Sequence, residues 1–146
     1  MRLAQVFALI CCVMMANPIG AHAADLKSDV AAAYEAFNAA FNKGDAKAVA
    51  SAYLPSAKIL PPTHAVVSGP AEIEKFFAGF FANGVTNHTL DIIDAGGDDK
   101  IVYATANWSA KGKGADGAPQ TLGGIATHVF ERQADGSLKL RLHTFN

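Results

Sequence analysis

Cysteine is scarce in this chain of 146 residues, and so is charge. The two cysteines, Cys11 and Cys12, are adjacent and lie within the first 23 residues. Residues 24–146 therefore offer no disulfide, no thiol nucleophile and no thiolate metal ligand. Charged residues make up 17% of the chain, and the formal net charge is −1. No basic cluster is present, so we expect no nucleic-acid partner.

Residues 1–23 have the pattern of a secretory signal peptide. Arg2 precedes an apolar run from Val6 to Ala16, and Ala21-His22-Ala23 supplies the small residues that a signal peptidase requires. The run is too short for a membrane span, and no other stretch is long and apolar enough. We therefore expect cleavage near Ala23, a periplasmic or secreted location, and a mature chain without a membrane span. Loss of Arg2 leaves 11 basic and 13 acidic residues, a net charge of −2.

The first helix is expected to begin near Leu26. Apolar residues recur every three or four positions from there to Phe41, which predicts one buried helix face. Ser28 or Asp25 is expected to cap the start of this helix, and Gly44 is suited to the left-handed residue that ends it.

Two further helices are expected in the first half of the mature chain. Asp45 is a good cap for a short second helix that ends at Tyr53 and is stopped by Pro55. Gly69-Pro70 opens a third helix, with Pro70 in its first turn. An apolar stripe on this third helix is typical of a buried face. The residues of the stripe are Ile73, Phe76, Phe77, Phe80 and Phe81.

The second half of the chain predicts long antiparallel strands separated by Gly-rich turns. Alternation places Val102, Ala104, Ala106 and Trp108 on one face of a strand. In the last strand, the inward face is either that of its leucines or that of His143. The expected strands are Thr86–Ala95, Ile101–Ala110, Thr121–Arg132 and Leu138–Phe145, with a shorter hairpin at Lys58–Leu60 and Val66–Val67.

The order of these elements predicts a single α+β domain over residues 24–146. In it, a cone-shaped, curved antiparallel sheet wraps around the three helices and encloses a pocket. The motifs Phe-Asn-Lys-Gly-Asp at 41–45 and Ser-Gly-Pro-Ala-Glu-Ile at 68–73 stand at the helix junctions. With this element order, the chain resembles the nuclear transport factor 2-like superfamily over Leu26–Asn146. It is most similar there to SnoaL-like and ketosteroid-isomerase-like bacterial proteins.

The resemblance implies a fold and, by itself, no single activity. The superfamily includes isomerases, dehydratases, hydrolases, cyclases and plain association domains. The ketosteroid-isomerase positions argue against isomerase chemistry here. Phe37 stands where the resemblance implies an oxyanion-hole tyrosine, Pro61 where it implies a general-base aspartate, and His128 near the position of a second acid. Enolisation requires a base and an oxyanion donor together, so this activity is not expected.

Three residues are candidates for acid–base chemistry: His128, His143 and Tyr53. The resemblance places Tyr53 at the pocket rim. An imidazole that faces a cavity can bind a ligand hydroxyl or transfer a proton near neutral pH. His64 and His88 lie in polar sequence and are expected to face water. The expected ligand-binding residues are Phe37, Tyr53, Phe77, Phe81, Trp108 and His128.

No metal or other cofactor is expected. The histidines of the mature chain are dispersed, with no ligand pair at helical or hairpin spacing. No glycine-rich phosphate loop follows a strand, and no serine lies on a nucleophile elbow.

Three functions are compatible with the sequence. The first is an exported protein that binds a small apolar or amphipathic molecule in its cavity. The second is a cofactor-independent acid–base enzyme acting on such a molecule. The third is a homodimeric interaction module that associates through the outer sheet face, where Ile101, Tyr103, Ile125 and Val129 are expected; dimers through the sheet are usual in the resembled superfamily.

Overall fold

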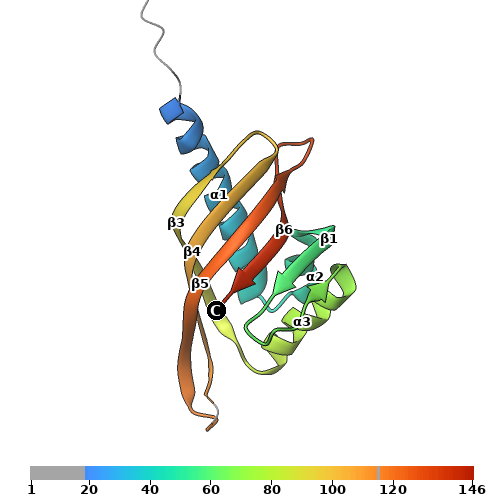
Figure 1. Cartoon of the computed structure of the whole chain (residues 1–146). Helices are drawn as coiled ribbons and strands as arrows, with labels where there is room; N and C mark the ends of the chain where they lie inside the picture. Colours follow the sequence, from blue (N-terminus) through green and yellow to red (C-terminus); the bar gives the residue numbers. More distant parts are fainter. Residues whose placement is uncertain (1–18, 115) are drawn as a thin grey trace, which may run out of the picture.

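The computed structural model describes residues 19–114 and 116–146, which form three helices and six strands (Figure 1). The expected signal peptide lies largely outside the described residues. None of the helices in the described part combines the length and hydropathy of a membrane span. The elements are α1 (Ile19–Asn42), α2 (Ala46–Ser51), β1 (Tyr53–Leu60), β2 (Val67–Ser68), α3 (Pro70–Ala82), β3 (Thr86–Gly97), β4 (Ile101–Lys113), β5 (Pro119–Arg132) and β6 (Leu138–Phe145).

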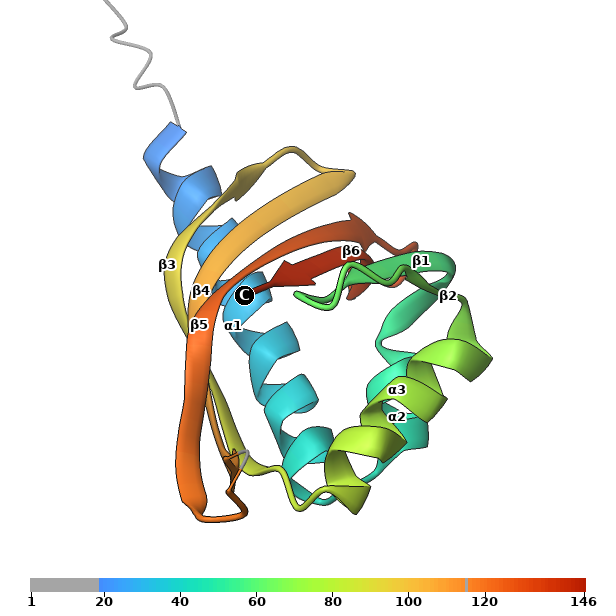
Figure 2. The same cartoon turned by 60° about the horizontal axis from the view of Figure 1, so that its bottom comes forward.

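The strands form one six-stranded sheet in the order β2-β1-β6-β5-β4-β3. This sheet curves around α1 and α3, which lie on its concave side (Figure 2). The expected α+β cone is therefore confirmed. One strand pair refines it, because β1 and β6 run parallel while every other pair is antiparallel. The long connection between β1 and β6, which includes α3 and four strands, makes a parallel pair possible.

The first helix begins earlier than its apolar pattern indicates. It starts at Ile19, so Asp25 and Ser28 lie inside the helix and the expectation that either one caps it is wrong. Alanines at 21, 23 and 24 favour helix and extend it toward the N-terminus. The expected buried face is confirmed. Its members are each at most 5% exposed: Leu26, Val30, Tyr34, Phe37 and Phe41.

The junction after α1 follows the sequence pattern. Gly44 has a φ of 70°, a left-handed conformation that glycine adopts without a Cβ penalty. The Asp45 side chain then caps α2 by accepting from the Ala48 backbone N–H at 2.9 Å. The end of α2 differs from the expectation, because Tyr53 opens β1 and Pro55 lies within that strand. The pairing of β1 with β6 shifts register between Tyr53 and Lys58. Pro55 lies in this irregular interval, where the missing backbone N–H does not interrupt a regular ladder of hydrogen bonds.

Small side chains on the sheet face large ones on the helices. The inner face of β4 carries Ala104, Ala106 and Ala110, and that of β5 carries Ala126, all at most 2% exposed. Phenylalanines from α1 and α3 fill the opposite side of the core. Because alanine is short, Ala110 and Ala126 leave room for the hollow that they line.

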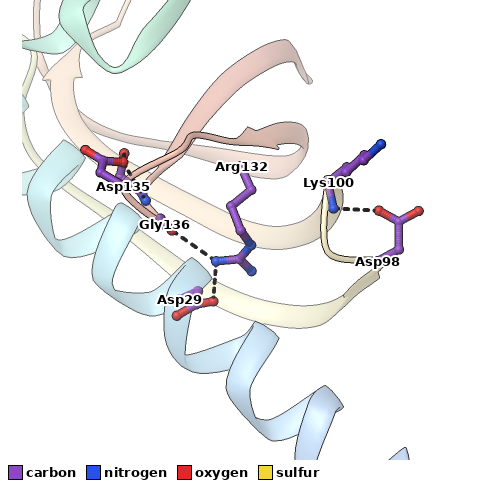
Figure 3. Close-up of polar contacts among 7 residues, drawn as sticks. Asp29, Asp98, Lys100, Arg132, Asp135 and Gly136 are labelled. Carbon is purple, nitrogen blue, oxygen red and sulfur yellow. Dashed lines mark hydrogen bonds and ion pairs between the residues drawn. The ribbon is translucent and has the colours of Figure 1, made fainter.

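An ion pair fastens one end of the sheet to α1 (Figure 3). The Arg132 Nη1 atom at the end of β5 lies 2.8 Å from Asp29 Oδ2 in α1. It also donates to the Gly136 carbonyl in the β5–β6 turn at 3.0 Å. Both side chains keep contact with solvent, so the pair contributes at most about 1 kcal/mol and serves mainly to orient the turn.

Candidate functional site

A hollow lies between the concave face of the sheet and the helices α1 and α3. Its free space measures about 490 Å³ including the open mouth, and the centre of a water molecule can occupy about 50 Å³ of it. Its walls are aromatic and aliphatic apart from three histidines, and none of the lining residues carries a carboxylate, ammonium or guanidinium group. The lining residues are Phe37, Phe41, Phe77, Phe80, Val85, His88, Leu90, Trp108, Ala110, Leu122, Ala126, His128, His143 and Phe145.

His128 on β5 is almost completely buried, at 1% exposure, and points inward. Alternation along β5 accounts for this orientation, since Ala126 and Phe130 on the same face are also buried. The partner of its Nδ1 atom is the Tyr34 hydroxyl on α1, at 2.7 Å. The structure thus pairs His128 with a tyrosine that the sequence placed only on the buried face of the first helix.

His143 on β6 also faces the hollow, although Leu140 is buried on the same side. A strict alternation forbids this combination. The register explains it, because Phe130 pairs with Leu140 and Val129 with Leu142, which leaves Arg141 as an extra residue. This β-bulge reverses the alternation, so that Leu140 before it and His143 after it both point inward. The sequence left open whether the leucines or His143 of this strand face inward. In the structure, the leucine face points inward before the bulge and the His143 face points inward after it.

Tyr53 is packed behind His143 rather than at the rim of the hollow. Its hydroxyl lies 2.7 Å from His143 Nδ1, and its side chain is 3% exposed. His128 and His143 are cross-strand partners, and their ring centres are 4.3 Å apart. The structure therefore holds two neighbouring tyrosine–histidine pairs whose imidazoles meet at the cavity wall.

His88 on β3 lines the cavity, although its polar sequence neighbours predict that it faces water. It is 8% exposed and stacks on Phe41, with ring centres 4.5 Å apart. The β3–β4 register shifts between Thr86 and Thr89, and Asn87 there has a φ of 54°. This irregularity frees the backbone of His88 from the sheet. A usable signal was present in the sequence, since His88 alternates with the apolar Leu90 and Ile92.

Two asparagines of α1 hold His88 in place. The Asn42 amide donates to the His88 carbonyl at 3.0 Å and accepts from the His88 N–H at 2.7 Å. The Asn38 Oδ1 atom lies 2.7 Å from the ring Nδ1. Helix α1 therefore supplies the hydrogen-bond partner of two of the three inward imidazoles, and β1 supplies that of the third.

All three imidazoles are neutral at physiological pH. Burial lowers the pKa of His88 to about 4. Burial, with the nearby His88, lowers the pKa of His128 to about 3. The pKa of His143 is also lowered, first by burial and then by the other two histidines. Burial raises the pKa of Tyr34 and of Tyr53, so both hydroxyls keep their protons.

The mouth of the hollow opens toward a groove on the outside of the cone. This groove is lined in part by Pro61, Pro62 and Thr63 of the β1–β2 connection, and it shares Trp108 and Phe145 with the inner hollow. The Trp108 indole N–H donates to the Asn146 backbone oxygen at 3.0 Å. At the same place Asn146 lies so close to Gly124 that a Cβ there would overlap it. The aromatic mouth is therefore fixed by the end of β6.

The expected ligand-binding residues divide into two groups. Phe37, Phe77, Trp108 and His128 line the hollow, as does His143. Tyr53 and Phe81 do not line it. Phe81 packs on Phe41, with ring centres 4.9 Å apart, and Tyr53 supports His143 from behind.

A metal centre has no support in the described part of the chain. No group of three His, Cys, Asp or Glu side chains among the described residues is placed to hold a metal ion. The three inward histidines each direct Nδ1 to the wall of the cavity, and no carboxylate joins them.

Comparison with known proteins agrees with the fold. No curated protein matches the chain. Solved structures with the same fold include Aln2 from a Streptomyces species, with 21% identity, a TM-score of 0.71 and coverage of 84% of this chain and 90% of that one. A ketosteroid isomerase-like protein from Erwinia carotovora atroseptica has 16% identity, a TM-score of 0.69 and coverage of 85% and 94%. An NTF2-like protein with a cystatin-like fold from Novosphingobium aromaticivorans has 12% identity, a TM-score of 0.66 and coverage of 87% and 84%.

The sequence itself matches a family profile. The SnoaL-like domain profile aligns with residues 34–140, which begin at the tyrosine that pairs with His128 and end within β6. The match includes His88 and His128 and ends just before His143. The chain belongs to the SnoaL-like domain family.

Proposed function

We propose that this protein binds a small, uncharged, largely apolar molecule in the hollow of its cone. The observation that carries the proposal is the lining, which is aromatic and aliphatic and contains no ionised side chain. Ligand sites of this kind are concave and mostly apolar, with a few polar groups that fix the orientation of the ligand. Here the three inward histidines supply those polar groups.

Binding is favoured over acid–base catalysis because the cavity lacks an effective base. A general base works best when its pKa lies near the working pH. The pKa of His88 is about 4 and that of His128 about 3, so both imidazoles are weak bases. Turnover by His128, Tyr53 and His143 is the second candidate function, supported by their two hydrogen-bonded pairs. This catalytic function requires a substrate whose binding raises the pKa of one of the imidazoles, so that the imidazole becomes a stronger base.

Trp108 provides a direct measurement of binding. It is the single tryptophan of the chain and lines both the hollow and the groove at its mouth, so its fluorescence reports on this one region. We expect a monocyclic aromatic probe such as ethylbenzene to change the emission in a saturable way. Natively purified protein is expected to carry a small molecule that mass spectrometry identifies. A linear, unsaturable response together with an empty protein would contradict the proposal. Chemical conversion of the bound molecule during incubation would favour the enzyme.

We further propose that the protein is a homodimer through the outer face of the sheet. Tyr103 and Ile125 are 45% and 50% exposed on this face. Substituting Ile125→Lys places a charge in such an interface and is expected to convert dimer to monomer in light scattering after size-exclusion chromatography. Val66→Lys, on the exposed β1–β2 connection, is the matched control and is expected to leave the dimer intact. A monomeric wild type would refute this assembly.

Export is the last part of the proposal. It rests on the pattern of residues 1–23, a charged start followed by an apolar run and small residues. Cleavage after Ala23 would give a mature chain that begins at Ala24, inside α1 as the structure describes it. Intact-mass measurement of the protein from a periplasmic or culture fraction is expected to show this start. A full-length mass in the cytoplasmic fraction alone would exclude export.

A further inference from the structure

The three cavity histidines differ in the chemical group that contacts Nδ1. Tyrosine hydroxyls contact His128 and His143, whereas an amide oxygen contacts His88. In a neutral imidazole one nitrogen donates and the other accepts, so the partner of Nδ1 decides the role of Nε2. The polarity that the cavity presents to a ligand therefore follows from these partners.

The second ring nitrogen of each histidine, Nε2, is the one left available to a ligand. All three rings are lining residues, and no hydrogen bond joins any of their Nε2 atoms to another described residue. In the described part of the chain, no fully enclosed side-chain nitrogen or oxygen lacks a partner. The unpaired Nε2 atoms are therefore in contact with free space.

His128 and His143 present donors. A phenol hydroxyl is a good donor and an imidazole nitrogen a good acceptor, so the favoured bond runs from the tyrosine O–H to Nδ1. The opposite arrangement would leave the Tyr53 hydroxyl hydrogen buried without an acceptor among the described residues, a cost of about 1–3 kcal/mol. With Nδ1 accepting, the proton of each neutral ring lies on Nε2, which points an N–H into the hollow.

His88 presents an acceptor. The Asn38 Oδ1 atom only accepts hydrogen bonds, so the Nδ1 atom of His88 carries the proton and donates. Its Nε2 atom then has a free lone pair at the cavity wall. The hollow thus combines two neighbouring donors on β5 and β6 with one acceptor on β3.

We propose that the natural ligand is a neutral hydroxy-carbonyl compound whose carbonyl oxygen lies between the Nε2–H groups of His128 and His143 and whose hydroxyl donates to His88. This inference rests on the proposed binding function and adds the polarity of the ligand to it. An apolar body fits the phenylalanine walls. Tyr34 and Tyr53 are positioning residues, because they fix the tautomer of the groups that touch the ligand.

The tautomers are measurable without any ligand. Long-range proton–nitrogen NMR of the ¹⁵N-labelled protein distinguishes the two neutral forms of each ring. We expect His128 and His143 to be protonated on Nε2, and His88 on Nδ1. Protonation of His128 and His143 on Nδ1 would overturn the inference.

The ligand polarity is tested with three compounds of similar size: ethylbenzene, acetophenone and 4′-hydroxyacetophenone. Affinities are taken from Trp108 fluorescence and from NMR shifts of the purified chain. We expect acetophenone to bind roughly tenfold more tightly than ethylbenzene, since it gains hydrogen bonds to neutral donors. The hydroxyl compound is expected to bind more tightly still, since its hydroxyl adds a hydrogen bond to His88.

Tyr53→Phe removes one positioning hydroxyl, and Tyr103→Phe on the outer sheet face is the matched control. We expect Tyr53→Phe to reduce the affinity for acetophenone toward that for ethylbenzene, to leave ethylbenzene binding unchanged, and to alter the His143 tautomer signal. Equal affinity of the wild type for ketone and hydrocarbon would overturn the inference while leaving the binding function in place. Failure of all three compounds to bind would refute the proposed function and the inference together.

Discussion

Replacing Phe37 with alanine is expected to lower the free energy of unfolding by about 3–5 kcal/mol, the usual cost of deleting a buried aromatic ring. Phe37 is 5% exposed at the centre of the helix face. Its ring contacts come from α1, α3 and three strands, so no single element can move to fill the space. Rings with centres within 6.4 Å are those of Phe41, Tyr53, Phe77, His88 and His143.

Urea unfolding measures this effect, with Phe37→Leu as the conservative variant. Leucine keeps most of the apolar volume and is expected to cost less than alanine. The exposed Ile93→Ala is the surface control, with an expected change within about 0.5 kcal/mol. A loss below about 1 kcal/mol for Phe37→Ala would show that the neighbouring rings collapse freely and that the hollow is not held open by rigid walls.

Stability is expected to fall steeply as the pH drops from about 6.5 toward 4. In the unfolded chain a histidine binds its proton near pH 6.5. In the folded chain the pKa is about 4 for His88 and about 3 for His128, and it is lowered for His143 as well. Between these values the unfolded state binds more protons, so acid favours unfolding. Each such histidine contributes up to about 1.4 kcal/mol per pH unit, which is a measurable part of an ordinary domain stability of about 5–15 kcal/mol.

The slope of unfolding free energy against pH is the diagnostic quantity. His88→Gln removes one titrating group and is expected to make the slope shallower by roughly one third, whatever its stability at pH 7. His64→Asn, at an exposed position on the β1–β2 connection, is the matched control and is expected to keep the wild-type slope. The pKa of Asp135 is lowered from its ordinary value of 3.8, so this carboxylate changes the stability only near and below pH 3.8, outside the range from pH 6.5 to 4. Equal stability at pH 7 and pH 5 would contradict buried neutral imidazoles.

Local patterns predicted most of the fold because burial acts on them directly. The three-four spacing from Leu26 to Phe41 identified the buried face of α1, and the alternation in β4 placed Val102 and Ala106 inward. Asp45 and Gly44 marked the break between two helices through their own cap and backbone preferences. Element ends were less well predicted. Helix α1 begins at Ile19 rather than near Leu26, and Tyr53 and Pro55 belong to β1 rather than to the end of the second helix.

The inward orientation of His143 illustrates what alternation misses. A bulge at Arg141 reverses the faces of β6, and another near Asn87 interrupts the start of β3. A bulge adds one residue without a distinctive local composition, so counting by twos fails beyond it. For His88 the misleading signal is a different one: its polar sequence neighbours predict exposure to water, although its spacing from Leu90 and Ile92 predicts an inward side chain. The pairing of Tyr34 with His128 joins residues 94 positions apart and has no local signal.

The sequence by itself determined the helix faces, the strand order along the chain and the apolar character of the interior, because these follow from periodicity and from the chemistry of single side chains. Tertiary structure alone decided which polar atoms meet inside. The roles of His88, His128 and His143 depend on what contacts each Nδ1 atom, and those partners come from α1 and β1. A proton position set by a distant neighbour is a property of the folded arrangement, since the neighbour arrives only when the sheet closes over the helices.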